Sequence, residues 1–261
     1  MPLTTYQTTI ARLLASNRSE DSYMAGGAAI HIEPNTSRYS NDLDYFHDSV
    51  ERVASAFAQD EKDLVSSGHQ VEIQMNQPGF IRAVVSQKDA STKVEWAHDS
   101  AWRFMPTVAD PRFGYQLHPV DLAVNKVLAL VGRDEPRDFI DVLMIDEQLL
   151  SLGALCWAAA GKDPGFTPRA ILDLLQRRGR YREEDFSRLH LAAPVDLLQQ
   201  KTRWLKMLKD AEQFIRSRPP DEFGCLYYSP KLKGFIQPSV QDPGDVVPHH
   251  GRPGGVLPRV V

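Results

Sequence analysis

The sequence has little cysteine and no long apolar run. Only Cys156 and Cys225 occur among 261 residues, and they stand far apart without a CxxC or Cys/His spacing. This excludes a disulfide framework and a zinc knuckle, and it favours a reducing cytoplasm. No stretch approaches about 18 uninterrupted apolar residues, and the N-terminus lacks a basic start followed by an apolar segment. We therefore expect neither secretion nor a membrane span.

An excess of one charge is also missing. The chain carries 30 Lys and Arg against 34 Asp and Glu, a formal net charge of -4. No global basic field therefore indicates nucleic acid, although a local patch is compatible with this balance. The run "RRGRYREED", with arginines at 177, 178, 180 and 182, is either a solvated helix end or a patch for a polyanion such as tRNA.

With 42% hydrophobic residues, the chain can bury a sizeable core in one large or two small domains. Residues 1–115 alternate helix-like and strand-like segments. Apolar residues recur at helical spacing over 50–67, "HQVEIQM" alternates as a strand, and "FIRAVVS" and "KVEWA" flank the polar connector "QKDAST". The fold class expected is α/β (α+β), a small mixed sheet with helices packed on it.

The remainder divides into a helical part and a tail. Over 116–234, Pro119 and Pro136 suit helix starts, Gly132 suits a helix end, and the segments "TPRAILDLLQRR", "REEDFSRLH" and "VDLLQQKTRWLKMLKDAEQFIRSR" read as further helices. Residues 235–261 contain five prolines and four glycines, a content too high for packed secondary structure. We expect a flexible or extended tail there.

Two carboxylates in "SNDLDYF" provide the first functional signal. In a strand, Asp42 and Asp44 project from one face while Leu43 and Tyr45 enter the core on the other. Neighbouring carboxylates repel each other unless a cation lies between them. Mg²⁺ is often held by one or two carboxylates together with substrate phosphates, which suits this pair. The alternative is a solvated turn.

Two glycines precede the aspartates. Gly26 and Gly27 follow the apolar "YMA" and come before the helix-like "AAIHI", so their backbone can approach a phosphate without a Cβ between them. A simple tight turn is the competing interpretation. Arg38 and Ser40 can add a positive charge and a hydroxyl. These residues together predict a site for a nucleoside triphosphate and its metal.

The stretch "GGAAIHIEPNTSRYSNDLDYF" resembles the minimal motif of the DNA-polymerase-β-like nucleotidyltransferase superfamily. More specifically, the chain resembles the AbiEii toxin-like nucleotidyltransferases of type IV toxin–antitoxin systems. In that family a helix with a lysine and an "RDxxDL"-like helix follow the catalytic domain. The corresponding segments are "NKVLAL" with Lys126 and "RDFIDVL" with Arg137, Asp138 and Asp141. The leucine of the motif is Val142 here, a conservative change.

The resemblance implies further site residues. The fold usually adds a third acidic residue, for which Glu95 in "KVEWA" is the candidate, as base or metal ligand, and Asp99 the fallback. Aspartate is commoner at that position in the superfamily. Lys126 is expected to neutralise triphosphate charge in a nucleotide cleft that the helical domain completes; the alternative is a lysine that snorkels to solvent. Asp138 and Asp141 are expected to position Lys126, Arg137 or the nucleotide, although Asp138 could instead stabilise a helix start.

The implied reaction is Mg²⁺-dependent transfer of a nucleotide from a triphosphate to an acceptor hydroxyl, with tRNA or another cellular acceptor and a cognate antitoxin as partners. Two alternatives stay open at this point. The same chemistry could modify a small molecule such as an aminoglycoside, or the chain could be a regulatory module that binds nucleotide without catalysis. The carboxylate pair argues against the second, because a pure binder has no need of it.

Overall fold

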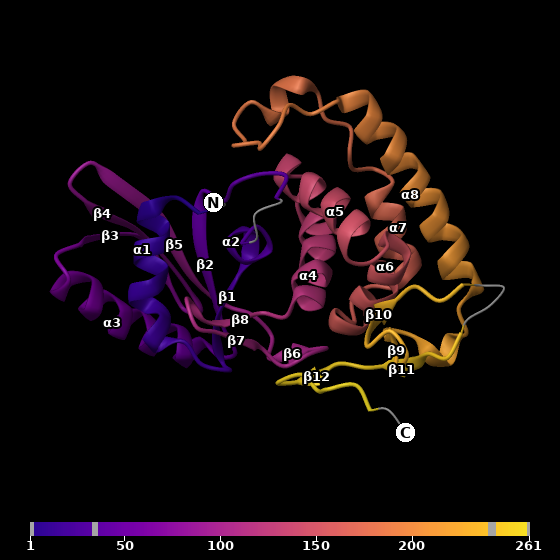
Figure 1. Cartoon of the computed structure of the whole chain (residues 1–261), viewed down its shortest axis with the longest axis horizontal. Helices are drawn as coiled ribbons and strands as arrows, with labels where there is room; N and C mark the ends of the chain where they lie inside the picture. Colours follow the sequence, from indigo (N-terminus) through magenta and orange to yellow (C-terminus); the bar gives the residue numbers. More distant parts are fainter. Residues whose placement is uncertain (1–2, 33–35, 240–243, 260–261) are drawn as a thin grey trace. The chain divides into compact units, whose positions relative to one another are not determined.

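The structure, a computed structural model, describes residues 3–32, 36–239 and 244–259. The chain forms two compact units (Figure 1). The first consists of Met1–Leu122, His190–Ala192 and Pro253–Gly255, and the second of Ala123–Leu189, Ala193–Arg252 and Val256–Val261. The main division therefore falls within helix α4 (Pro119–Gly132), a few residues beyond the expected boundary at 115. Two short segments from later in the chain also belong to the first unit.

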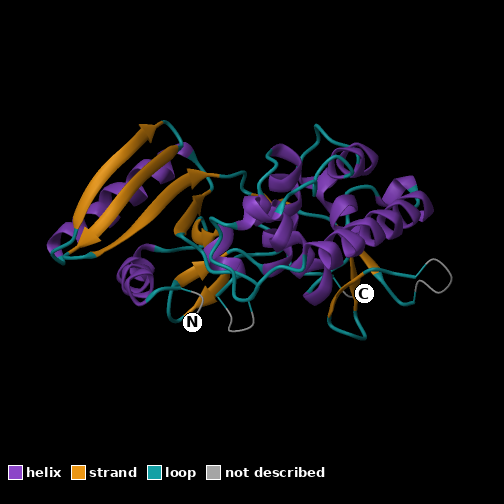
Figure 2. Cartoon of the chain, turned by 90° about the horizontal axis from the view of Figure 1, so that it is seen from above, coloured by secondary structure: helices purple, strands orange, loops and turns teal. Residues whose placement is uncertain are grey.

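The first unit is built on a mixed seven-stranded sheet with the order β3-β4-β5-β2-β1-β8-β7. The parallel pairs are β2 with β5 and β1 with β8. Helices α1 and α3 contact the central strands from one face of the sheet (Figure 2). The elements are β1 (Ser22–Ala25), β2 (Asp42–His47), β3 (Gln70–Gln77), β4 (Phe80–Gln87), β5 (Ala90–His98), β6 (Trp102–Arg103), β7 (Val108–Asp110), β8 (Gly114–Gln116), α1 (Thr5–Leu14), α2 (Gly26–Ile30) and α3 (Val50–Ser66). The predicted α/β class is confirmed.

The elements predicted from periodicity form for the expected reasons. Helix α3 begins after Ser49, whose hydroxyl accepts from the Arg52 N–H, and it buries the apolar stripe around Phe57 and Leu64. Strands β4 and β5 pair as an antiparallel hairpin. Strand β3 also forms, but its pairing with β4 shifts register between Ile73 and Met75. This bulge moves Met75 to the other face, so the three apolar residues of "HQVEIQM" do not share one side.

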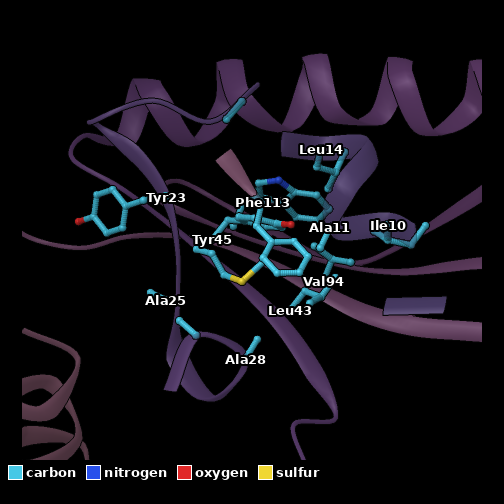
Figure 3. Close-up of a cluster of buried hydrophobic side chains, with 14 of the residues drawn as sticks. Ile10, Ala11, Leu14, Tyr23, Ala25, Ala28, Leu43, Tyr45, Val94 and Phe113 are labelled. Atoms are coloured by element: carbon cyan, nitrogen blue, oxygen red, sulfur yellow. The ribbon is translucent and has the colours of Figure 1, made fainter. Parts of the chain in front are cut away.

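The core of the first unit lies between the sheet and helices α1 and α3. Leu43 and Tyr45 of β2 pack with Val94 of β5 and with Ile10 and Leu14 of α1, as Figure 3 shows. The alternating burial along β2 and β5 follows directly from the pleat, which sends successive side chains to opposite faces. The core therefore fixes which side chains of β2 face away from α1 and α3.

A buried ion pair crosses this core. The Arg18 guanidinium and the Asp60 carboxylate lie 2.6 Å apart, and both side chains are fully buried. Asp60 also accepts from the Trp96 indole N–H at 2.7 Å and from the Asn17 amide at 2.8 Å. Each oxygen of the carboxylate is therefore satisfied, which offsets the cost of removing the charge from water.

The second unit is mainly helical, as expected. Its long helix α8 packs against α6 and α7. The segment "REEDFSRLH" differs from the prediction, because only a single 3-10 turn, Glu183–Phe186, forms there. Within the described ranges, none of the helices has the length and hydropathy that a membrane crossing requires. The helices are the main part of α4, α5 (Pro136–Gln148), α6 (Leu152–Lys162), α7 (Pro168–Leu175) and α8 (Leu197–Ser217).

The Pro/Gly-rich end, expected as a flexible or extended tail, carries short strands. β10 (Gly234–Ile236) and β11 (Val247–His249) pair with either side of β9 (Leu226–Ser229), and β12 (Arg252–Pro253) pairs with β6. Pro248 fits because β11 is an edge strand, where a missing N–H costs no ladder bond. Residues 240–243 and 260–261 of this segment lie outside the described residues. High proline content therefore did not prevent strand pairing.

Replacing Asp60 tests the buried network. We expect Asp60→Ala to lower the free energy of unfolding by about 3–5 kcal/mol, because Arg18 would keep a buried, unpaired charge. The control is Glu61→Ala, because Glu61 is the next residue along α3 and its side chain is half-buried. This substitution should change the free energy of unfolding by about 0.5 kcal/mol or less. Urea unfolding followed by circular dichroism measures both. If the two substitutions lower the free energy of unfolding equally, the Arg18–Asp60 pair adds no net stability.

Candidate functional site

Two carboxylates lie on the face of β2 that points away from the core. Asp42 and Asp44 are half-buried, whereas Leu43 and Tyr45 between and beside them are fully buried. The Asp42 side chain keeps 13% of its surface exposed, so it is accessible to solvent. The structure therefore places both aspartates on one face of one strand.

Gly26 brings the main chain against one of these carboxylates. Strands β1 and β2 pair antiparallel with Ala25 opposite Asp44, so the turn that leaves β1 begins beside Asp44. Gly26 has φ 59°, in the left-handed region, and a Cβ added there would lie 1.9 Å from Asp44 Oδ2. Both the conformation and the close approach require glycine at this position.

Gly27 faces a second pair of predicted residues. A Cβ on Gly27 would lie 3.0 Å from the Arg38 guanidinium and 3.0 Å from the Ser40 hydroxyl. Arg38 is buried, and Ser40 donates its hydroxyl to the Asp42 carbonyl at 3.0 Å. Residues 33–35 of the motif lie outside the described residues. The two glycines therefore lie beside the loop that carries Arg38 and Ser40 and beside β2.

The third acidic candidate lies on the neighbouring strand. β2 and β5 run parallel with Glu95 opposite Asp44, and neighbouring strands are about 4.8 Å apart. Glu95 is half-buried, while Val94 and Trp96 are fully buried, so Glu95 projects from the face of the aspartates. Asp99 follows His98, the last residue of β5 and the last residue of β5 that pairs with β2. Of the two candidates, Glu95 is the one beside Asp44.

Two cations that we did not predict share this face. The Lys93 ammonium lies 2.9 Å from Asp42 Oδ2 and 3.4 Å from Glu95 Oε1, and the Arg82 guanidinium donates to Glu95 Oε1 at 2.8 Å. The alternation in "KVEWA" already placed Lys93 two residues before Glu95 on the same face. That signal could have identified Lys93. Arg82 requires the β4–β5 register, in which it pairs with Glu95.

The remaining predicted residues belong to the second unit. Lys126 on α4 is buried, and its ammonium lies 2.9 Å from Asp138 Oδ1 and 2.9 Å from Asp141 Oδ2 on α5. Both carboxylates are fully buried, and Arg133 also donates to Asp138 at 2.7 Å. Burial alone raises the Asp138 pKa, but Lys126 and Arg133 outweigh it and hold that pKa below its usual value. Asp138 is therefore ionised at neutral pH.

Arg137 and the arginine run complete the set. Arg137 is half-buried on α5 beside Asp138. Within "RRGRYREED", Arg178 donates to the carbonyls of Leu130 and Val131 at the end of α4, at 3.2 and 2.7 Å. It thereby satisfies carbonyls that a helix end leaves without internal partners. The other three arginines of the run are exposed.

The first-unit side chains suit a divalent cation of the hard type. Carboxylate oxygens are the ligands that Mg²⁺ prefers, and Asp42 and Asp44 supply them from one strand face. The Asp42 carboxylate pairs with the Lys93 ammonium at 2.9 Å in this structure. Among the described residues, no group of three or more His, Cys, Asp or Glu is arranged to hold a metal ion.

The chain is similar to solved nucleotidyltransferases. It matches MenT4, a nucleotidyltransferase toxin from Mycobacterium tuberculosis H37Rv, at 14% identity over 83% of each chain with a TM-score of 0.53. It matches JHP933 from Helicobacter pylori at 14% identity, over 81% of this chain and 91% of that one, with a TM-score of 0.47. No curated protein matches by sequence. At this identity the MenT4 match establishes the fold.

The family is established by sequence. The model of the family described as "Nucleotidyl transferase AbiEii toxin, Type IV TA system" matches residues 9–224, well over half of the chain. The match includes the glycines, the aspartate pair, Lys126 and the α5 acidic residues. The chain belongs to the AbiEii family of nucleotidyltransferase toxins of type IV toxin–antitoxin systems.

Proposed function

We propose that the protein transfers a nucleoside monophosphate from a triphosphate to an acceptor hydroxyl, with Mg²⁺ as the metal and tRNA as the acceptor. The close approach of Gly26 to the Asp44 carboxylate is the main observation in support. It puts the partly exposed main chain of Gly26 beside the face that carries both aspartates, an arrangement that suits a triphosphate and its metal. The family adds a nucleotide substrate and a cognate antitoxin as partner to this proposal.

Asp42 and Asp44 would hold the metal ion, which would stabilise negative charge on the attacking and leaving oxygens. Gly26 and Gly27 would offer their backbone to the phosphates, with Arg38 and Ser40 beside Gly27. In the reaction, the acceptor oxygen forms a bond to the α-phosphorus. The bond from that phosphorus to the β-phosphate oxygen breaks, and pyrophosphate leaves with its electron pair. Glu95, opposite Asp44, would take the hydroxyl proton.

In the second unit, Lys126 is the proposed phosphate ligand. Its three N–H donors can satisfy more than the two carboxylates that it contacts at 2.9 Å. Asp138 and Asp141 fix the ammonium in position, because it lies 2.9 Å from a carboxylate oxygen of each. Arg137, beside Asp138 in the chain, is proposed to support the same nucleotide.

The aspartate pair should be essential for transfer. We expect Asp42→Asn and Asp44→Asn each to lower transfer at least 100-fold, because an amide cannot replace a carboxylate as a charged metal ligand. The assay incubates total tRNA and Mg²⁺ with each of the four α-labelled ribonucleoside triphosphates in turn.

The control is Asp89→Asn in the β4–β5 turn, an exposed aspartate that should transfer at the parent rate. If Asp42→Asn and Asp44→Asn retain the parent far-UV spectrum and label tRNA at the parent rate, the two aspartates do not belong to the site. If the parent labels a small molecule and does not label tRNA, the acceptor is that small molecule and the tRNA part of this proposal is wrong.

A single methyl group at Gly26 should also inactivate the enzyme. In Gly26→Ala the new Cβ would meet Asp44 Oδ2 at 1.9 Å, so the carboxylate or the turn must move. We expect at least a 100-fold loss of transfer with the sheet retained. Gly132→Ala is the matched control, because a Cβ there has no neighbour within 4 Å. Wild-type transfer by Gly26→Ala would mean that Asp44 is not needed in this position.

Lys126 should contribute directly to triphosphate affinity. We expect Lys126→Met to weaken triphosphate binding about tenfold or more, equivalent to ~1.4 kcal/mol. It should also destabilise the fold, since Asp138 and Asp141 would remain buried without the ammonium.

Calorimetric titration well below the melting temperature separates these two effects. Arg133→Met is the control, because this arginine contacts the same Asp138 but is about half exposed. Unchanged affinity in folded Lys126→Met would restrict Lys126 to a structural role.

A further inference from the structure

Lys93 bridges two carboxylates at the heart of the proposed site. Its ammonium is 2.9 Å from Asp42 Oδ2 and 3.4 Å from Glu95 Oε1. The three side chains keep 31%, 13% and 17% of their surface exposed for Lys93, Asp42 and Glu95. These groups are thus partly withdrawn from water, which strengthens their mutual attraction relative to a fully solvated pair.

The backbone register brings these three side chains together on one sheet face. In the parallel pair of β2 and β5, Lys93 lies opposite Asp42 and Glu95 lies opposite Asp44. Lys93 and Glu95 are two residues apart on β5, so they share one face. On the next strand, Arg82 lies opposite Glu95. Three acidic and two basic side chains therefore occupy neighbouring positions of one sheet face, with Asp42 opposite Lys93 and Glu95 opposite Arg82.

A divalent cation at Asp42 would meet Lys93 directly. The carboxylate oxygen that Lys93 contacts, Asp42 Oδ2, is one of the oxygens that Asp42 offers to a metal. Two positive charges within a few ångströms repel each other, even in a partly solvated site. The metal and the lysine therefore compete for the same acid.

Lys93 also has a second position available. Its flexible four-carbon side chain already lies near Glu95, so an ammonium that leaves Asp42 retains an acidic partner. Arg82 differs in this respect, because it lies opposite Glu95 and its guanidinium donates to Glu95 Oε1 at 2.8 Å. The two cations thus have distinct relations to the proposed metal ligands.

We propose that Lys93 is an internal competitor cation: its ammonium pairs with Asp42 and must move towards Glu95 before a divalent cation binds, so that Lys93 sets the metal affinity of the site. This inference rests on the proposed function, because it takes Asp42 as a metal ligand. Lys93 is therefore a positioning residue that acts through Asp42, and it keeps the carboxylate oriented and charge-compensated.

The test measures Mn²⁺ binding to the full chain by the loss of the free-ion signal in electron paramagnetic resonance. Lys93→Met keeps the side-chain length and removes the charge, and we expect it to bind Mn²⁺ at least about tenfold more tightly than the parent. Arg82→Met is the matched control. This variant removes the same charge from the same face, and Arg82 contacts Glu95 as Lys93 does. We expect Arg82→Met to change the Mn²⁺ affinity less than about threefold.

A double variant connects the effect to Asp42. In an Asp42→Asn background, adding Lys93→Met should change Mn²⁺ affinity less than about threefold, because the contested carboxylate is gone. Lys93→Gln serves as the second variant if Lys93→Met does not reach the parent far-UV spectrum.

The outcomes separate this inference from the proposed function. Mn²⁺ binding to the parent that is unaffected by Asp42→Asn would overturn both. Mn²⁺ binding that depends on Asp42 but is no tighter in Lys93→Met than in the parent would overturn only the competition by Lys93. The same holds if Arg82→Met tightens Mn²⁺ binding as much as Lys93→Met does. Tighter binding in Lys93→Met alone, lost in the Asp42→Asn background, is the expected result.

Discussion

The contact between the Gly26 turn and the Asp44 carboxylate depends on strand register, and the proposed chemistry depends on that contact. Ala25 pairs with Asp44 because β1 and β2 run antiparallel, and the chain leaves β1 through a glycine in the left-handed region. The register is fixed in turn by burial, since a shift of one residue would move Leu43 and Tyr45 out of the core and both aspartates into it. The hydrophobic core thereby orients the acidic face.

Four of the acidic groups of interest, Asp42, Glu95, Asp138 and Asp141, have a positively charged partner nearby. Lys93 pairs with Asp42, Arg82 with Glu95, and Lys126 with Asp138 and Asp141. The pairs differ in burial. Asp138 and Asp141 are fully buried, so their partner cannot leave without a large electrostatic penalty. Lys93 is about one-third exposed and has two acidic neighbours, so its pairing can change at low cost.

Local sequence patterns predicted most of the regular elements and the side of β2 that carries the aspartates. The alternation in "DLDYF" and the helical spacing over 50–67 each depend on burial of one face, which the sequence records directly. The β3 bulge and the cluster of Lys93, Arg82 and Glu95 depend on pairing between strands, which no single segment encodes. The roles of the predicted site residues remain predictions, although the structure places Gly26 against Asp44 and Lys126 against Asp138 and Asp141.

The strands near the C-terminus illustrate a limit of composition. The proline content predicts an extended tail, but β11 tolerates Pro248 because, within the described part of the chain, β11 lies at the edge of its sheet. Gly255 also belongs to a close contact, since a Cβ there would lie 2.2 Å from the Met105 backbone. Such positions become understandable only after the partner segment is known.

The most direct test of the central claim compares α-labelled and γ-labelled forms of the triphosphate that the parent enzyme uses. If the acidic face of β2 directs attack at the α-phosphorus, the α-label enters the acceptor and the γ-label appears in pyrophosphate in equal amounts, and Asp44→Asn does neither. Transfer of the γ-label to the acceptor, or equal α-label transfer by Asp44→Asn, would contradict the account.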